Sequence, residues 1–209
     1  METNEQRRPA ALLLGPTGSG KTPLGDLLAE RGLWGRPCVH LDFGHELRRL
    51  AAGERSDASL SADDLAFIAR VLDEGALLEN EHFPIARRIV TAFLRAEDPA
   101  GEALLVLNGL PRHIGQAADL DTIAAVETVI HLFCTPAVVR ERIRTDPGGD
   151  RTGRVDDAPE AVAKKLDLFA RRAVPLLEYY GGRGARVETM IVSATATPPD
   201  VWEELDGRR

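Results

Sequence analysis

The sequence contains only two cysteines in its 209 residues, Cys38 and Cys134. They lie far apart and form no Cys-x-x-Cys pair, which argues against a disulfide framework and against a zinc cluster of the usual spacing. A chain with so little use for cysteine is expected in a reducing compartment, and we predict a cytoplasmic location.

Long hydrophobic runs are also missing. The first apolar run, residues 11–14, ends at a glycine, and the chain opens on the polar stretch METNEQRRPA. A membrane-spanning helix needs about 20 consecutive apolar residues. Neither a membrane span nor a secretory signal is therefore predicted, and we expect no membrane partner.

Positive charge is in deficit as well. The chain has 26 lysines and arginines against 33 acidic residues, and its formal net charge is −7. General nucleic-acid binders meet the phosphate backbone with a basic surface, so we expect no nucleic-acid partner. With 44% hydrophobic residues, and with no repeat, the chain is expected to form one globular domain over residues 1–209.

Five short apolar runs, separated by helical stretches, are the main pattern that is present. They occupy residues 11–14, 37–41, 103–108, 128–133 and 187–192. Short apolar runs that alternate with helices are typical of buried parallel strands. The sequence therefore predicts an α/β fold in which a five-stranded parallel sheet carries helices on both faces.

Two further segments stand out from this alternation. Residues 42–98 hold more helix than a crossover between neighbouring strands needs, so we predict a helical insertion over the strand ends. Residues 144–154, RTDPGGDRTGR, combine glycines with arginines, which predicts a mobile, cationic loop. The predicted core comprises residues 8–41 and 101–209.

The segment GPTGSGKT, residues 15–22, fits the pattern GxxxxGK[ST] at every specified position and follows the first apolar run. In this pattern a glycine-rich backbone cradles phosphates, the lysine reaches the β- and γ-phosphates, and the hydroxyl ligates Mg²⁺ directly. The sequence thus predicts a P-loop NTPase fold that binds ATP with Mg²⁺. The predicted ATP-binding residues here are Gly15, Thr17, Gly18, Ser19, Gly20, Lys21 and the Mg²⁺ ligand Thr22.

A second candidate site follows the third apolar run, in LNGLPRHIGQA, residues 107–117. Arg112 and Gln116 are four residues apart, so a helix that starts near Arg112 places them on one face. A guanidinium suits a phosphate, and an amide suits the edge of a base. On these residues alone, a solvated helix face explains the pattern equally well.

Several segments together resemble the adenylate kinases and related nucleoside monophosphate kinases. NGLPR…Q is similar to the DGFPR…Q motif, and GRVDD followed by a helix, a proline and YY is similar to the short-lid stretch of these enzymes. FGHELR resembles their TGDLLR region, and DEGALL resembles their GxLV turn. The segments occur in the order of the family and cover most of the chain.

This resemblance implies direct in-line transfer of a phosphoryl group from ATP to a nucleoside monophosphate. It also implies that the protein is a monomer and that its binding partners are these nucleotides. Such transfer needs aligned phosphates and neutralised charge. Residues 42–98 would bind the monophosphate and residues 144–155 would form a short lid. The implied catalytic residues are Lys21, Arg112, Arg142 and Arg154, and the lid side adds Arg142 and Arg151 to the ATP site.

The acceptor site is likewise implied by the resemblance. Arg48 and Arg112 would hold the acceptor phosphate, and Gln116 would read the acceptor base. Lys165 stands where the family has another arginine. The full implied set is Phe43, Arg48, Ala76, Leu77, Leu78, Gly109, Arg112, Gln116, Arg154 and Lys165.

The chain departs from the family pattern at several positions. Asn108 stands where the family has the aspartate that orients the water shell of Mg²⁺, and a neutral amide holds a hydrated cation less strongly. Thr22 and Pro23 replace the Gly-Thr of GKGT. Phe43 and His45 replace the Thr and Asp of TGD, which leaves the acceptor base open.

Two alternative functions remain open on the sequence. A nucleotide-binding regulatory module with weak or no turnover is suggested by Asn108. A P-loop kinase of a small non-nucleotide metabolite is suggested by GKTPLG and by the altered FGH segment. A tRNA prenyltransferase can share such a phosphate loop, but this chain is short and acidic for that role.

Overall fold

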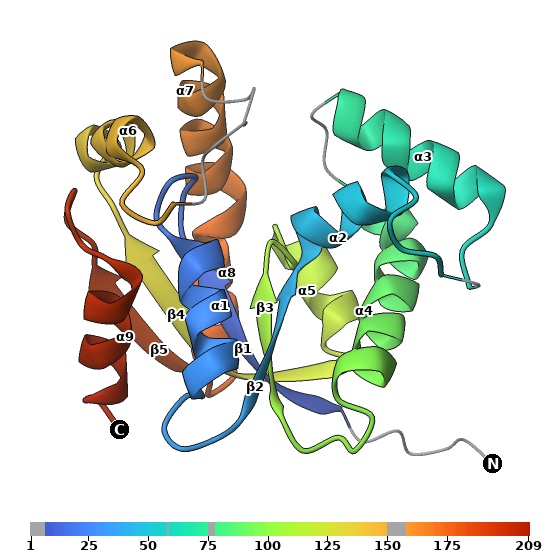
Figure 1. Ribbon diagram of the computed structural model, residues 1–209, viewed down its shortest axis with the longest axis horizontal. Coiled ribbons are helices and arrows are strands. Elements are labelled where there is room, and N and C mark those ends of the chain that lie inside the picture. Colours follow the sequence, from blue (N-terminus) through green and yellow to red (C-terminus); the bar gives the residue numbers. More distant parts are fainter. Residues whose placement is uncertain (1–6, 58, 75–77, 150–157) are drawn as a thin grey trace.

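The computed structural model describes residues 7–57, 59–74, 78–149 and 158–209. At its centre lies a parallel sheet with the strand order β2-β3-β1-β4-β5 (Figure 1). The strands are β1 (Arg8–Leu14), β2 (Cys38–Asp42), β3 (Leu104–Asn108), β4 (Ala124–Phe133) and β5 (Arg186–Ile191). The predicted α/β fold is confirmed, and each predicted apolar run coincides with one strand to within a few residues.

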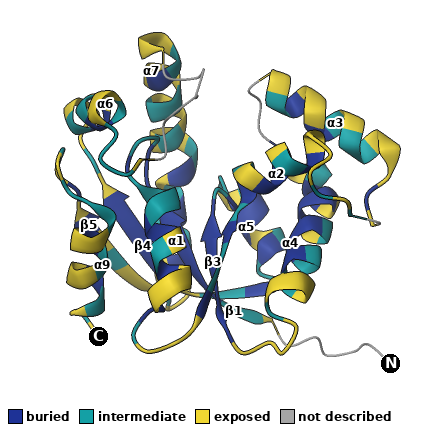
Figure 2. Cartoon of the chain, in the orientation of Figure 1, coloured by how far each residue is buried: buried dark blue, intermediate teal, exposed yellow. Residues whose placement is uncertain are grey.

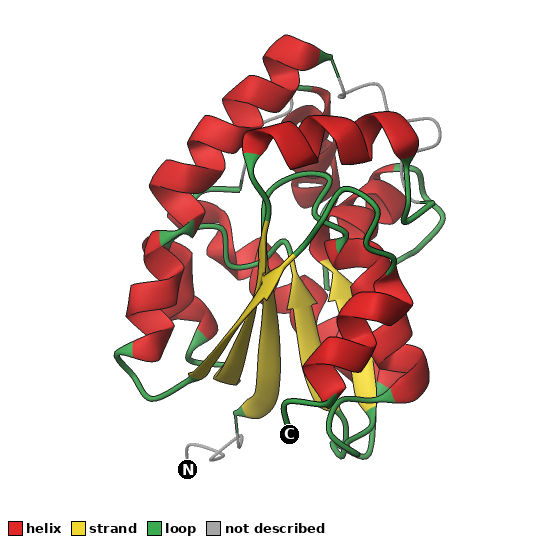
Figure 3. Ribbon diagram, turned by 90° about the vertical axis from the view of Figure 1, so that its left-hand side faces the viewer, coloured by secondary structure: helices red, strands yellow, loops and turns green. Residues whose placement is uncertain are grey.

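Helices cover both faces of this sheet (Figure 3). One face packs against α1 (Lys21–Arg31) and α9 (Pro198–Asp206). The other face packs against α4 (Phe83–Glu97), α5 (Ile114–Leu120) and α8 (Pro175–Gly181). None of the described helices is long and apolar enough to cross a bilayer.

Strand β1 shows why the central strands are apolar throughout. Successive side chains of a strand point to opposite faces. Ala11 and Leu13 therefore join the core beneath α1 and α9, while Leu12 and Leu14 join the core beneath α4 and α8. All four are at most 3% exposed, so the strand that leads into the phosphate loop is fixed from both sides.

Between β2 and β3 the chain forms α2 (Phe43–Ala51), α3 (Ala62–Asp73), a 3₁₀ turn η1 (Asn80–His82) and α4. The side chain of Ser61 caps α3, because its Oγ accepts from the Asp64 amide at 3.1 Å while the Ser61 amide donates to Asp64 Oδ2 at 2.8 Å. This reciprocal pair is a capping box. Helix α3 lies at the outside of the molecule, and much of its surface is exposed (Figure 2).

After β4 the chain continues through α6 (Pro136–Thr145), α7 (Pro159–Leu168), the π-turn η2 (Phe169–Ala173) and α8. The sequence predicts one long helix that bends at Pro175. Pro175 has no amide proton to donate, and the residue before it, Val174, bonds the carbonyl of Phe169 five residues back at 3.1 Å. The chain thus forms a π-helical segment directly ahead of the proline, a feature that commonly accompanies helix kinks.

Candidate active site

The ends of three neighbouring strands, β2, β3 and β1, lie side by side at the carboxyl edge of the sheet. Asn108 ends β3 and pairs in register with Leu13 of β1 on one side and with Asp42 of β2 on the other. Ligands of parallel α/β sheets bind outside the carboxyl ends of the strands, where the strand order reverses. Here that point lies beside β1, and Figure 3 shows the strands ending beneath a layer of loops and helices.

The phosphate loop connects β1 to α1 through backbone conformations that glycine favours. Gly18 and Gly20 have φ angles of 74° and 92°, which side chains disfavour. A Cβ atom on Gly15 would lie only 2.6 Å from Ser19 Oγ, so the missing side chain makes room for that hydroxyl. The loop ends at the N-terminus of α1, where backbone amides and the helix dipole attract anions.

Lys21 and Thr22 begin α1. The Lys21 ammonium donates to the carbonyls of Gly15 and Pro16 at 2.8 and 2.7 Å, which holds it across the loop. The Thr22 hydroxyl donates to Asp42 Oδ2 at 2.6 Å. The lysine therefore lies over the phosphate loop, while the threonine faces the ends of β2 and β3.

Asp42, at the end of β2, is a charged side chain of this site that the sequence analysis did not predict. Its Oδ2 also accepts from Asn108 Nδ2 at 3.1 Å, and the same nitrogen donates to Thr22 Oγ1 at 3.1 Å. Its Oδ1 accepts from the His45 amide at 2.9 Å and so caps α2. The only signal in the sequence is a carboxylate directly after the apolar run of residues 37–41.

Asp42 stays ionised in this setting. Burial alone raises the pKa of its carboxyl, but hydrogen bonds from the Thr22 hydroxyl and the His45 amide, with the nearby Arg48 guanidinium, hold the pKa below its usual value. A hydrogen-bonded carboxylate favours its charged form. The end of β2 thus carries a fixed negative charge at neutral pH.

The predicted acceptor arginines lie on the other side of that carboxylate. A Cβ atom built on Gly44 would lie 3.5 Å from Asp42 Oδ1, 3.5 Å from Arg48 Nη1 and 4.0 Å from Arg112 Nη2. The two guanidiniums therefore converge on the bare backbone of Gly44. Such a pair of cations beside a glycine can hold an anion with two or more charge-assisted hydrogen bonds.

Arg112 is held in place by its own loop. Its Nε donates to the carbonyl of Gly109 at 3.0 Å, and its amide donates to Gln116 Oε1 at 2.9 Å. Burial lowers the pKa of the Arg112 guanidinium and the neighbouring Asp42 opposes that shift, but a guanidinium keeps its proton in proteins. The side chain is a fixed cation that faces Asp42 and Gly44.

The other predicted acceptor residues differ in burial and in whether they lie near the two arginines. Gln116 is buried, and both ends of its amide are bonded within the chain, to the Arg112 amide and to the Leu78 carbonyl. A base would reach this glutamine only by replacing one of those partners. Phe43 and Leu78 are buried, Gly109 borders Arg112, and Lys165 lies on α7. Ala76, Leu77, Arg151 and Arg154 lie outside the described residues.

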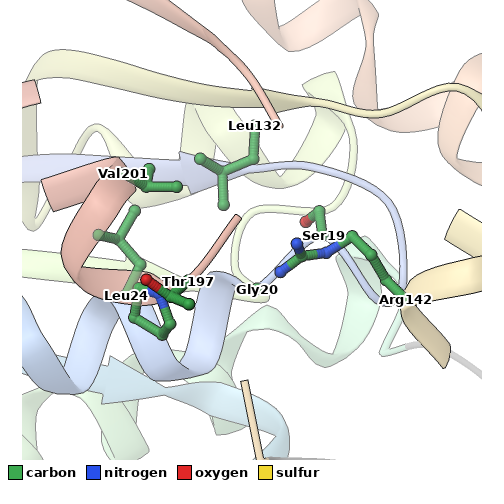
Figure 4. Close-up of a pocket in the computed structure, with 8 residues that line it drawn as sticks. Ser19, Gly20, Leu24, Leu132, Arg142, Thr197 and Val201 are labelled. Atoms are coloured by element: carbon green, nitrogen blue, oxygen red, sulfur yellow. The ribbon is translucent and has the colours of Figure 1, made fainter. Parts of the chain in front are cut away.

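Arg142 approaches the phosphate loop from α6. Its Nε donates to the Gly18 carbonyl at 2.9 Å, and its Nη1 donates to the Ser193 and Ala196 carbonyls at 2.8 and 2.7 Å. Figure 4 shows the guanidinium pointing toward Gly20 across a small pocket. The pocket is lined by Ser19, Gly20, Leu24, Leu132, Arg142, Thr197, Pro198 and Val201.

Arg142 therefore links the phosphate loop to the segment between β5 and α9, on the side away from Arg112. Of the predicted residues, the structure brings Thr22 and Asn108 into contact and places Arg48 and Arg112 around a neighbouring glycine. A hydroxyl and a carboxylate are the hard oxygen donors that Mg²⁺ prefers. Among the described residues, no group of three or more His, Cys, Asp or Glu forms a metal cluster.

Comparison with known proteins places these features in context. No protein-family model matches the chain. It is 30% identical to an adenylate kinase of Phenylobacterium zucineum (strain HLK1), over 85% of this chain and 86% of that protein. It is 30% identical to an adenylate kinase of Stenotrophomonas maltophilia (strain K279a), over 85% and 89%, and 29% identical to one of Synechococcus sp. (strain CC9311), over 94% and 96%.

Proposed function

This chain belongs to the adenylate kinase family, whose reaction is the ATP-dependent transfer of a phosphoryl group to a nucleoside monophosphate. We propose the following roles for its residues in that reaction. The reaction converts ATP and the monophosphate to ADP and the nucleoside diphosphate. Family membership does not favour the regulatory module or the metabolite kinase.

The donor site is the phosphate loop. Lys21, already held across the loop by two backbone carbonyls, exchanges these for phosphate oxygens and neutralises the charge on the group that moves. Arg142 borders the loop at Gly18 and Gly20. Its guanidinium holds the loop in place and contributes to binding of the donor nucleotide.

The acceptor phosphate binds over Gly44, between Arg48 and Arg112. The observation that carries this assignment is the position of Asp42, whose Oδ2 contacts Thr22 of the loop while its Oδ1 faces Gly44 and the two arginines. A single carboxylate therefore borders both sites. Two phosphates bound on its two sides would lie end to end, as direct in-line transfer requires.

Mg²⁺ fits the donor side of this arrangement. Thr22 would ligate it directly, and Asn108 would lie in its water shell. The ion, when bound, spreads the negative charge of the β- and γ-phosphates. The residues around it would orient the two nucleotides.

The segments around the site complete the proposal. Residues 42–98 serve as the monophosphate-binding insertion and residues 144–155 as the short lid, with the rest of residues 1–209 as the core. The acceptor set extends to Ala76 and Leu77, and the lid adds Arg151 and Arg154. We propose a monomer, and a cytoplasmic location in keeping with the two isolated cysteines.

A coupled assay tests the function. The purified chain is incubated with ATP and Mg²⁺ and, in separate reactions, with AMP, CMP, UMP, GMP or dTMP, and ADP formation is followed. Turnover with at least one acceptor is expected. Absence of turnover with all five, in protein that melts cooperatively, would overturn the assignment.

A further inference from the structure

We propose that Asp42, at the end of β2, provides the carboxylate for the water shell of the nucleotide-bound Mg²⁺, in place of the aspartate that the family carries at position 108. The proposal rests on the proposed function. It concerns a residue at a position where the resemblance assigns no metal role, and it explains why an amide at position 108 is compatible with the reaction.

The Thr22 hydroxyl provides the first step of the argument. The hydroxyl donates a hydrogen bond to Asp42 Oδ2 at 2.6 Å. One of its two lone pairs accepts from Asn108 Nδ2 at 3.1 Å, which leaves the other for a cation. A threonine that ligates Mg²⁺ in a P-loop needs such an acceptor for its proton. In the described part of the chain, the carboxylate that accepts a hydrogen bond from the Thr22 hydroxyl is that of Asp42.

Asn108 provides the second step. Its Nδ2 donates to both Thr22 Oγ1 and Asp42 Oδ2, each at 3.1 Å, and its backbone pairs in register with Asp42. A carboxylate at position 108 would lie against the carboxylate at position 42, and two such groups in contact cannot both ionise readily. The neutral amide at position 108 is therefore compatible with the negative charge at position 42. The site has one carboxylate, at the end of β2 and not of β3.

A capping role alone does not require the charge of Asp42. Its Oδ1 caps α2 by accepting from the His45 amide, and asparagine or serine caps a helix about as well as aspartate. The contact with Thr22 uses the other oxygen, Oδ2. Asp42→Asn therefore keeps the cap and removes the charge, which separates the two roles.

The test measures Mn²⁺, a spectroscopic substitute for Mg²⁺, bound to the complex of the protein with a non-hydrolysable ATP analogue, by electron paramagnetic resonance. Asp42→Asn should weaken Mn²⁺ binding in this complex by about tenfold or more, the usual effect of losing an outer-shell partner. Affinity for the analogue in excess chelator should stay unchanged or rise. Asp42→Ser, which also keeps a cap, should show the same loss.

The reciprocal exchange makes the test specific. Asn108→Asp alone should weaken Mn²⁺ binding or lower the melting temperature, because two carboxylates then meet. Asp42→Asn combined with Asn108→Asp moves the charge back to β3 and should restore Mn²⁺ binding to within about threefold of the parent, well inside the loss of about tenfold or more expected without an outer-shell partner. Parental Mn²⁺ binding in Asp42→Asn and Asp42→Ser, or tighter binding in Asn108→Asp alone, would overturn the proposal.

These readouts need no turnover, so their failure is distinct from failure of the proposed function. If Mn²⁺ binding follows the predicted order while the coupled assay detects no acceptor, the metal site stands and the reaction assignment falls. If turnover is found while Asp42→Asn binds Mn²⁺ like the parent, the reaction stands and the role of Asp42 falls.

Discussion

The phosphate loop takes its anion-binding groups from one continuous segment, residues 15–22, whereas the arginine side takes Arg48 from α2 and Arg112 from the loop after β3. The loop is shaped by local backbone conformation, in particular the positive φ angles of Gly18 and Gly20. The arginine side depends on β2 pairing with β3. The two sides should therefore respond differently when single residues are changed.

The largest effect is expected at the loop, from Lys21→Ala. Loss of a cation that stabilises the transferred group should lower kcat by about 10²–10³-fold, the typical cost of removing one electrostatic stabiliser. The lysine is only half-buried and bonds loop carbonyls, so the melting temperature should change little. Steady-state kinetics together with thermal melting check both parts. A large fall in stability would mean that Lys21 is structural.

The next effect tests the separation of the two sides. Arg112→Ala removes a charge-assisted contact to the acceptor phosphate, and one such hydrogen bond has a net contribution of about 1.5–3 kcal/mol. The KM for the monophosphate should rise by about ten- to hundredfold, since 1.4 kcal/mol is a factor of ten, while the KM for ATP changes little.

The matched control for this change is Arg95→Ala, an exposed arginine near the end of α4, which should leave both constants unchanged. Equal losses for ATP and the monophosphate in Arg112→Ala would contradict the two-sided arrangement. Arg112→Lys should recover only part of the acceptor affinity, because an ammonium cannot grip a phosphate with two parallel bonds.

The same contrast explains what could be predicted from the sequence. The phosphate loop and the strand β1 before it are contiguous in the sequence. The GxxxxGK[ST] motif therefore identified the loop, and the apolar run before it identified the strand. The contact between Asp42 and Asn108 joins residues 66 positions apart, and it follows from the strand order, which no local pattern encodes. The interruption of the helix near Pro175 is suggested by the proline, but no local pattern in the sequence identified the π-helical segment ahead of it.

A smaller effect is expected where the two arginines converge. Gly44→Ala adds a methyl group that would lie in ordinary contact with Asp42 and Arg48, in the space proposed for the acceptor phosphate. Alanine in a helix is favoured over glycine by about 0.5 kcal/mol or more, so stability should rise slightly while the KM for the monophosphate rises a few-fold. Gly181→Ala in α8, where a Cβ meets only Val187, is the matched control. An unchanged monophosphate KM in Gly44→Ala would place the acceptor phosphate elsewhere.

The smallest effect is expected from a contact between the segment ahead of α4 and η2, outside both phosphate sites. Glu79, ahead of α4, accepts from Arg172 of η2 at 3.0 and 2.8 Å. Hydrogen bonds from Arg172, with the nearby His113 and His82, hold the pKa of Glu79 below its usual value. A half-exposed pair of this kind contributes under about 1 kcal/mol.

Because the pKa of Glu79 is lowered on folding, its contribution is fully present above the ordinary glutamate pKa of about 4.3 and is lost as the pH falls through the lowered value. Unfolding free energies of the parent, Glu79→Gln, Arg172→Gln and the double variant should give a coupling that is constant from pH 7 to about pH 5 and vanishes in more acidic solution. A cost of Glu79→Gln that grows as the pH falls and persists in the Arg172→Gln background would show that His113, 3.7 Å from the carboxylate, is its main partner. Substrate constants should stay within about twofold throughout, since surface pairs of this strength do little beyond their own contact.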